Sequence, residues 1–255
     1  MTMTLSARHI AITAALFASQ CAYANVVHIE TSGLTFDTSW SPQAETLVSD
    51  VNGAATFSLV NAVSSLRFPF QFNYFNDYAG VFQLSARNGY KVTGYTLSGG
   101  LFGTVYVGRS PDGFGRPGGA DTSAGVMSRA QDAVTGETLV QHGWWGANLQ
   151  GNADFSFHSG VLNRTGAFNI SFDGYAYGQA SPAIWTTYEP EIGAVNHYDF
   201  SRAEVGLKDP LLLTVYTEAL AVAVPEPHTF ALTLTGLALL AGVVRRRRRP
   251  ARAQA

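Results

Sequence analysis

Short runs of hydrophobic and polar positions alternate with a period of two along residues 25–224. The run from Leu66 to Phe75 puts four aromatic side chains on one parity, and therefore on one face of an extended strand: Phe68, Phe70, Phe72 and Tyr74. No segment of this region shows a convincing helical period. The pattern predicts strands over residues 55–60, 66–75, 81–87, 90–98, 101–108, 122–129, 137–142, 153–158, 167–175, 183–188 and 211–223.

The number and length of these runs predict an all-β fold, with antiparallel strands in two packed sheets as a sandwich or jelly roll. Asn88 and Gly89 separate two of the runs. This dipeptide supplies the two positive φ angles of a type I′ turn, so we expect a β-hairpin there. The glycine-rich stretch 109–121 would suit a domain boundary, but the strand pattern continues unchanged after it. One domain over residues 25–224 is therefore the preferred interpretation.

The first 24 residues have the three parts of a secretory signal peptide. A segment with Arg8 and no acid comes first, an apolar stretch of ten residues follows, and Ala22 and Ala24 form the small-residue pattern that signal peptidase cuts. An uncleaved anchor helix is the alternative, but this stretch is too short to cross a hydrocarbon core of about 30 Å. We expect cleavage after Ala24 and export from the cytoplasm.

Cysteine content and charge limit the classes of function. The only cysteine, Cys21, lies in the expected signal peptide, so disulfides, a thiolate nucleophile and cysteine-ligated zinc are excluded in the mature chain. Residues 25–224 carry nine basic and 17 acidic residues, and the remaining basic residues lie near the two ends. An acidic body argues against nucleic acid as a partner, because phosphate binding requires a basic surface.

Residues with metal-binding or cofactor-binding patterns are sparse in the body. No nucleophile elbow, P-loop or dinucleotide motif follows a predicted strand, so we expect no cofactor and assign no catalytic or metal-binding residue. A metal site assembled from distant strands stays open. So does calcium binding by segments 72–78 and 110–115, although neither has the spacing of a calcium loop. The histidines of the mature body, none at metal-ligand spacing, are His28, His142, His158 and His197.

Polysaccharide hydrolysis is the enzymatic alternative, since it needs only two carboxyl groups about 5–10 Å apart around one sugar. Glu189 and Glu191 share one parity, and Asp173 lies beside aromatic residues, so each is a candidate for such a pair. Acids in loops are usually solvated surface residues, and nothing local favours catalysis. A non-catalytic domain is the preferred interpretation.

Adjacent tryptophans, Trp144 and Trp145, give the body its clearest binding signal. In a strand they point to opposite faces, so at most one lies in the core of a two-sheet fold. The other is then an exposed indole, flanked by glycines and followed by three amides: Asn148, Gln150 and Asn152. Apolar sugar faces stack on such rings, so the pair is a candidate glycan-binding site. The alternative is that the pair bridges core and edge, or that a loop covers it.

The end of the chain has three parts with distinct physical roles. Pro225, Glu226 and Pro227 form an extended segment after the last strand. An apolar run from Phe230 to Val244 predicts a transmembrane helix over 229–244, which is short for a bilayer unless the membrane thins and cationic side chains extend to the headgroups. A cluster of five arginines then favours a cytoplasmic end for the chain: Arg245, Arg246, Arg247, Arg248 and Arg249.

The sequence VPEP, the short apolar helix and the terminal arginine cluster resemble the PEP-CTERM sorting signal of Gram-negative bacteria. The resemblance covers residues 225–249 and the expected signal peptide, and it differs in the extra residues 250–255 after the arginines. It implies that an exosortase, a membrane-embedded cysteine protease-transpeptidase, recognises Pro225, Glu226 and Pro227. Proteins with this signal are associated with exopolysaccharide, biofilm and floc formation.

Together these features predict a signal peptide (1–24), a β domain (25–224), a sorting signal (225–249) and a short cytoplasmic end (250–255). The expected path crosses the inner membrane, with transient anchoring and a periplasmic body, and ends at the cell surface or in the extracellular matrix. The expected partners are signal peptidase, an exosortase and an extracellular polysaccharide. The body is interpreted as a structural or glycan-binding module, with a secreted polysaccharide hydrolase as the alternative.

Overall fold

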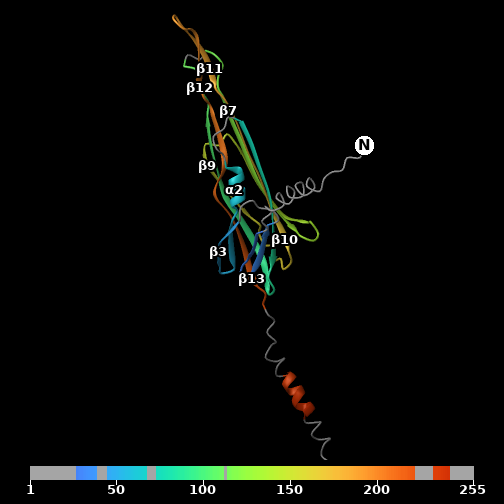
Figure 1. Ribbon diagram of the computed structural model, residues 1–255. Coiled ribbons are helices and arrows are strands. Elements are labelled where there is room, and N and C mark those ends of the chain that lie inside the picture. The colour runs from blue at the N-terminus through green and yellow to red at the C-terminus, as the bar shows by residue number, and fades with distance from the viewer. Residues whose placement is uncertain (1–26, 39–44, 68–72, 112–113, 222–231, 242–255) are drawn as a thin grey trace, which may run out of the picture. The chain divides into compact units, whose positions relative to one another are not determined.

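Antiparallel strands make up most of the chain, as the alternating pattern predicts (Figure 1). The computed structural model describes residues 27–38, 45–67, 73–111, 114–221 and 232–241. The chain divides into two units, Met1–Ala219 and Leu220–Ala255. All the strands belong to the first unit.

Two large sheets and one hairpin form this first unit. The six-stranded sheet has the order β1-β2-β5-β10-β7-β8, from strands β1 (Val27–Glu30), β2 (Leu34–Thr38), β5 (Asn73–Ala86), β7 (Gly119–Asp132), β8 (Thr138–Ala147) and β10 (Phe168–Ser181). The five-stranded sheet has the order β3-β4-β13-β6-β9, from strands β3 (Thr46–Val51), β4 (Ala54–Ser58), β6 (Tyr90–Tyr106), β9 (Gly151–His158) and β13 (Arg202–Ala219). The hairpin consists of β11 (Ala183–Glu189) and β12 (Gly193–Asp199).

Buried side chains from both large sheets belong to one hydrophobic cluster. Phe36 on β2 of the six-stranded sheet stacks on Phe57 on β4 of the five-stranded sheet, with ring centroids 4.3 Å apart. Phe36 also stacks on Phe82 on β5, at 5.5 Å. All three rings are buried. Burial of this apolar surface is the main stabilising term, since the part of the chain that the structure describes contains no cysteine.

A short helix, α2 (Val60–Leu66), lies between β4 and β5, so the expectation of a body without a helix was wrong. Seven residues are too few to show a helical period in the sequence. The helix buries Ala62, Val63 and Leu66 in the hydrophobic cluster. At its first turn, the Asn61 side chain donates a hydrogen bond of 2.9 Å to the Glu45 carboxylate. Burial raises the pKa of Glu45, and this bond and the backbone amides of Val60 and Asn61 oppose that rise.

The turn at Asn88 and Gly89 forms, but it does not make the predicted type I′ hairpin. The Tyr90 amide donates to the Arg87 carbonyl at 2.9 Å, which closes the turn. Gly89 has a φ of 84°, whereas Asn88 is not among the residues with positive φ. One positive φ at the second central position is typical of a type II turn, whose twist splays the flanking strands. The turn accordingly leads from β5 in one sheet to β6 in the other.

Several predicted strands are parts of longer ones. The runs at 90–98 and 101–108 belong to a single strand, β6, because the glycines between them do not break it. A Cβ at Gly99 would lie 2.8 Å from Leu211 Cδ1 and 3.0 Å from Phe155 Cζ. These contacts mean that the glycine permits close packing rather than a turn.

The hairpin of β11 and β12 joins the two sheets. β10 of the six-stranded sheet leads into β11, and β12 leads into β13 of the five-stranded sheet, so the hairpin lies at one end of the unit (Figure 1). Ser201, between β12 and β13, donates a hydrogen bond of 2.6 Å to the Ser181 carbonyl at the end of β10. The same hydroxyl accepts a bond of 2.9 Å from the Gly108 amide. These contacts tie the ends of both sheets together where the hairpin begins.

In the second unit the structure describes one helix, at residues 232–241, within the range expected to span a membrane. Its leucines are exposed. Among the described residues, no helix has the length and apolar character needed to cross a membrane. The remaining positions of the expected helix lie outside the described residues. The same holds for the signal peptide, the Pro-Glu-Pro motif and the arginine cluster.

The core stacking generates a stability prediction. Phe57→Ala should lower the free energy of unfolding by about 3–5 kcal/mol, because it removes a fully buried ring and leaves a cavity beside Phe36. Phe114→Ala is the matched control. Its ring is 79% exposed, so the change should stay within about 0.5 kcal/mol. Chemical denaturation of both variants measures the difference, and equal losses would contradict the packing described.

Candidate functional site

Trp144 and Trp145 lie on the edge strand β8, on opposite faces of the six-stranded sheet. Trp145 is 66% exposed. Trp144 is partly buried, packs against the hydrophobic cluster and leans over Gly146, where a Cβ would collide with its ring. The two indoles therefore have different environments, and Trp145 is the more exposed of the two.

Trp145 borders a groove of about 330 Å³ on the outer face of the sheet. Tyr175 on β10, Gly125 on β7 and Trp145 on β8 occupy one cross-strand row. Since neighbouring strands are about 4.8 Å apart, the two aromatic residues are about 10 Å apart at their Cα atoms, with only a glycine between them. A Cβ at Gly125 would lie 2.6 Å from Tyr175 Cε1, so the tyrosine ring leans over the glycine. Gly125 therefore leaves room for the Tyr175 ring to lie against the sheet.

A third aromatic ring extends this surface on β5. Phe75 is 63% exposed and stacks on Tyr175, with centroids 6.4 Å apart and planes 17° apart. The Tyr175 hydroxyl lies 3.3 Å from the Ser123 hydroxyl, which fixes the far end of the ring. Trp145, Tyr175 and Phe75 thus form an aromatic surface across strands β8, β10 and β5. We call these three residues the aromatic track.

Two carboxylates flank the aromatic track. Asp173 lines the groove beside Met127, and Asp77 is paired with Tyr175 across β5 and β10. Asp77 and Asp173 occupy diagonal positions on adjacent strands, a relation that places Cα atoms about 7–8 Å apart. Burial raises the pKa of Asp173, and the nearby Arg129 guanidinium opposes this rise. Arg129 itself donates to the Gln141 side chain at 3.2 Å.

The three amide residues that follow the tryptophans lie in or beside the connection between β8 and β9, and the contacts described for them are not with Trp145. Asn148, with a φ of 51°, accepts a hydrogen bond of 2.8 Å from the Thr122 amide. Gln150 donates a bond of 2.7 Å to the Val105 carbonyl, and Asn152 is paired with Phe102 on β6. Two of the three amides are therefore used in backbone contacts. The carboxylate that lines the groove with Trp145 is that of Asp173 on β10, and the sequence around the tryptophans gives no sign of it.

Glu189, Glu191 and Asp173 are not brought together. Glu189 ends β11 at the tip of the hairpin, where it is paired with Gly193, and Glu191 lies in the turn that follows. Asp173 lies within β10, before the hairpin begins. The carboxyl group near Asp173 is that of Asp77.

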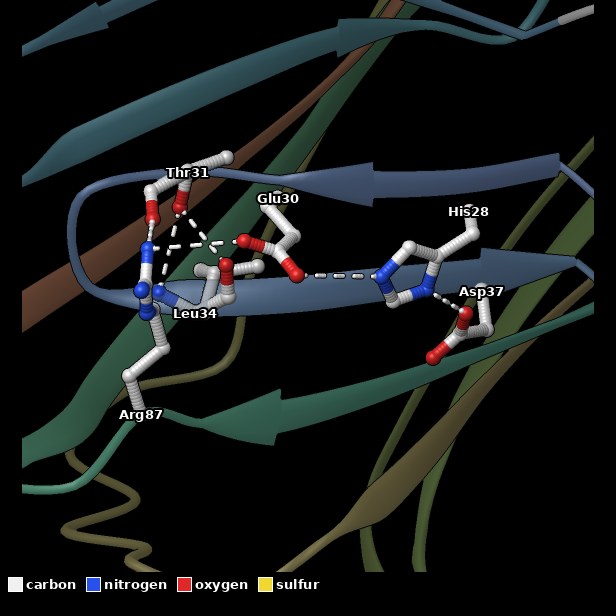
Figure 2. A network of polar contacts seen from close by, with 6 residues as sticks. All are labelled: His28, Glu30, Thr31, Leu34, Asp37 and Arg87. Atoms are coloured by element: carbon white, nitrogen blue, oxygen red, sulfur yellow. Dashed lines mark hydrogen bonds and ion pairs between the residues drawn. The ribbon is translucent and has the colours of Figure 1, made fainter.

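A network of polar contacts surrounds His28 on the β1–β2 hairpin (Figure 2). His28 Nδ1 lies 2.5 Å from Asp37 Oδ1, and His28 Nε2 lies 3.5 Å from Glu30 Oε1. Arg87 lies 3.9 Å from the other Glu30 oxygen and donates a bond of 2.8 Å to the Thr31 carbonyl. The hydrogen bond that the His28 ring donates to Asp37, followed by the one to Glu30, raises the pKa of His28. A carboxylate lies near each ring nitrogen of His28, and these contacts favour the protonated ring and link β1 to β2.

The other histidines also make structural contacts. His142 on β8 stacks on Phe157 on β9, at 5.7 Å, and its Nε2 lies 2.8 Å from the His158 carbonyl. These contacts link edge strands of the two large sheets. His197 stacks on Trp185 within the hairpin, at 5.4 Å.

A metal centre is not formed by the residues that the structure describes, since they contain no group of three or more His, Cys, Asp or Glu residues able to hold an ion. Of the two segments considered for calcium, 72–78 places Asn76 and Asp77 on opposite faces of β5, and Asn76 donates to the Ser65 carbonyl at 3.1 Å. Part of each segment lies outside the described residues.

No protein-family model matches the chain, and no curated protein matches it. The assignment of function therefore rests on the chain's own sequence and geometry.

The His28 network generates a pH-dependence prediction. The pKa of His28 in the folded state lies above its ordinary value of about 6.5, so its stabilising effect is fully present below that value. The effect is lost as the pH rises through the folded pKa. His28→Gln should therefore destabilise the protein more at about pH 6 than at about pH 9, as measured by chemical denaturation.

Asp37→Asn is the control, because it removes the largest cause of the raised pKa. In this variant the His28 pKa measured by NMR titration should fall toward its ordinary value. An unchanged titration would refute the assignment of Asp37 as the main partner.

Proposed function

We propose that this is an exported protein of the cell envelope or extracellular matrix, sorted through its carboxy-terminal signal, whose β domain binds polysaccharide without catalysis. The observation that carries the binding role is the exposed Trp145, on an open groove that Tyr175 and Asp173 also line. An exposed indole beside a carboxylate suits a sugar, because the apolar sugar face stacks on the ring and hydroxyl groups donate to the acid.

The sorting role follows from the sequence of both ends. In this proposal signal peptidase cuts after Ala24, and residues 229–244 form a membrane-spanning helix that holds the chain transiently in the inner membrane. An exosortase then recognises Pro225, Glu226 and Pro227. The arginine cluster keeps the chain end in the cytoplasm, as the positive-inside rule requires. The amino-terminal and carboxy-terminal signals require the same topology, which supports both.

The finer architecture that we propose for the body is a sandwich or jelly roll. The supporting observation is the single hydrophobic cluster to which both large sheets contribute. In such an arrangement one face of the six-stranded sheet faces the core, and the other is free for a long polymer to lie across its strands. The aromatic track lies on this free face.

Polysaccharide hydrolysis is a second candidate, favoured by one observation. Asp77 and Asp173 lie diagonally across β5 and β10 next to the aromatic track, a spacing compatible with a pair of carboxyl groups around one glycosidic bond. The raised pKa of Asp173 is what a general acid requires. A hydrolase releases reducing ends from the host's own exopolysaccharide and loses this activity in Asp173→Asn, whereas a binding module releases none.

The two tryptophans generate a prediction that separates binding from folding. Trp145→Ala should leave the melting temperature nearly unchanged and abolish retardation in affinity electrophoresis through host exopolysaccharide, because it removes an exposed ring. Trp144→Ala should instead lower the free energy of unfolding by about 3 kcal/mol, because Trp144 packs against the core.

These two variants control each other. If both melted early, the pair would be purely structural and the binding site would lose its main residue. If both melted and migrated normally, the β domain would have no role in glycan binding.

Sorting makes a separate prediction about the ends of the mature chain. Mass spectrometry of the protein from its native host should find an amino terminus at Asn25 and no peptides beyond the Pro-Glu-Pro region, because both signals are removed. Recovery of intact peptides running through Arg245, without any shorter form, would contradict processing by an exosortase.

A further inference from the structure

We propose that the groove beside Trp145 recognises an ammonium group, and that the polysaccharide bound by this domain is a polymer of an amino sugar with free amines. This inference rests on the proposed glycan-binding function and specifies its ligand class. It follows from the chemistry of the groove lining, in which aromatic faces and a carboxylate surround the same space: Trp145, Tyr175 and Asp173.

The aromatic residues supply one half of the recognition. A cation within about 6 Å of a ring face is attracted by the electron density of the ring, and tryptophan gives the strongest attraction. Trp145 is exposed, and Tyr175 leans over Gly125 toward the same groove. Phe75, stacked on Tyr175, continues the aromatic surface and provides a place for the next sugar of a chain.

The carboxylates supply the other half. Asp173 lines the groove one row away from Trp145 and Tyr175, and Asp77 lies directly opposite Tyr175 on β5. The charged groups on this face from β7 are Arg129, which donates to Gln141 and whose charge acts on Asp173, and Asp121 near the start of the strand. Gly143 and Gln141 on β8 carry no charge. An ammonium group that enters the groove is therefore attracted by the Asp173 carboxylate, and the sugar ring that carries the ammonium group lies against the aromatic faces.

Charge complementarity decides against the other classes of polysaccharide. Uronic acid or sulfate groups would lie beside Asp173 and Asp77 in a body that is already acidic, and like charges in contact are unfavourable. A neutral sugar can stack on the aromatic rings, but it offers the two carboxylates only hydroxyl groups as hydrogen-bond donors. A hydrogen bond from an ammonium group to a carboxylate is stronger than one from a hydroxyl group. The groove therefore favours the cationic polymer.

Isothermal titration calorimetry of the full-length protein tests this, with a glucosamine tetramer and an N-acetylglucosamine tetramer as matched probes. Acetylation removes the positive charge and keeps the sugar backbone. We expect the glucosamine tetramer to bind about 10-fold more tightly, since bonds to charged groups contribute more than neutral ones. Added salt should weaken its binding selectively.

Variants of the carboxylates show whether the groove is responsible. Asp173→Asn should bring the affinity for the glucosamine tetramer down to that for the acetylated one, and Asp77→Asn should lower it by a smaller factor. Glu191→Gln, an exposed acid at the tip of the distant hairpin, is the control and should change nothing. Thermal melts of all three variants show whether each one is folded. If Asp173→Asn does not fold, Asp77→Asn becomes the variant that tests the role of the carboxylates.

The outcomes distinguish this inference from the function on which it rests. Equal binding of both tetramers, lost in Trp145→Ala, would overturn ammonium recognition and leave glycan binding intact. Tighter binding of an alginate oligomer would likewise overturn it. If the two tetramers and the host exopolysaccharide all failed to bind, glycan binding itself would be refuted.

Discussion

Burial of one face of each large sheet in a shared hydrophobic cluster is the interaction on which the rest of the structure depends. Phe36, Phe57 and Phe82 bring strands of both sheets into contact, and no covalent cross-link assists them in the described part of the chain. Because successive residues of a strand alternate between faces, this burial also fixes which residues point outward. On β10 the burial of Phe172 and Gly174 thus turns Asp173 to the outer face.

The period-two pattern predicted the all-β antiparallel fold well because inner strands of the large sheets, such as β10, alternate between buried and more exposed positions. It missed α2, whose seven residues are held by burial in the core rather than by a visible period. It also misplaced the partner of β5, because Asn88 and Gly89 suit a hairpin in local terms. Which sheet receives β6 is decided by its pairing with β13, more than 90 residues later in the sequence. Local propensity does not contain that information.

The candidate site was predictable only in part, for the same reason. Two adjacent tryptophans in a strand must point to opposite faces, so an exposed indole was foreseeable from the sequence. The residues that give it a chemical character are Gly125, Asp173 and Tyr175, and they lie on two other strands. They meet Trp145 through the register of β7 with β8 and of β7 with β10. A shift of one residue in either pairing would turn their side chains to the other face.

The position of β13 has a consequence for the timing of folding. β13 is the central strand of the five-stranded sheet and also the last strand that the structure describes. It pairs with β4 and β6 from the first half of the sequence. Pairings between such distant segments form slowly, because closing the intervening loop costs entropy before the contacts repay it. The two earlier strand pairs of that sheet, β3 with β4 and β6 with β9, are therefore joined only when nearly all of the chain has been synthesised. For a chain exported as we propose, this delay keeps it in the extended form in which it crosses a membrane.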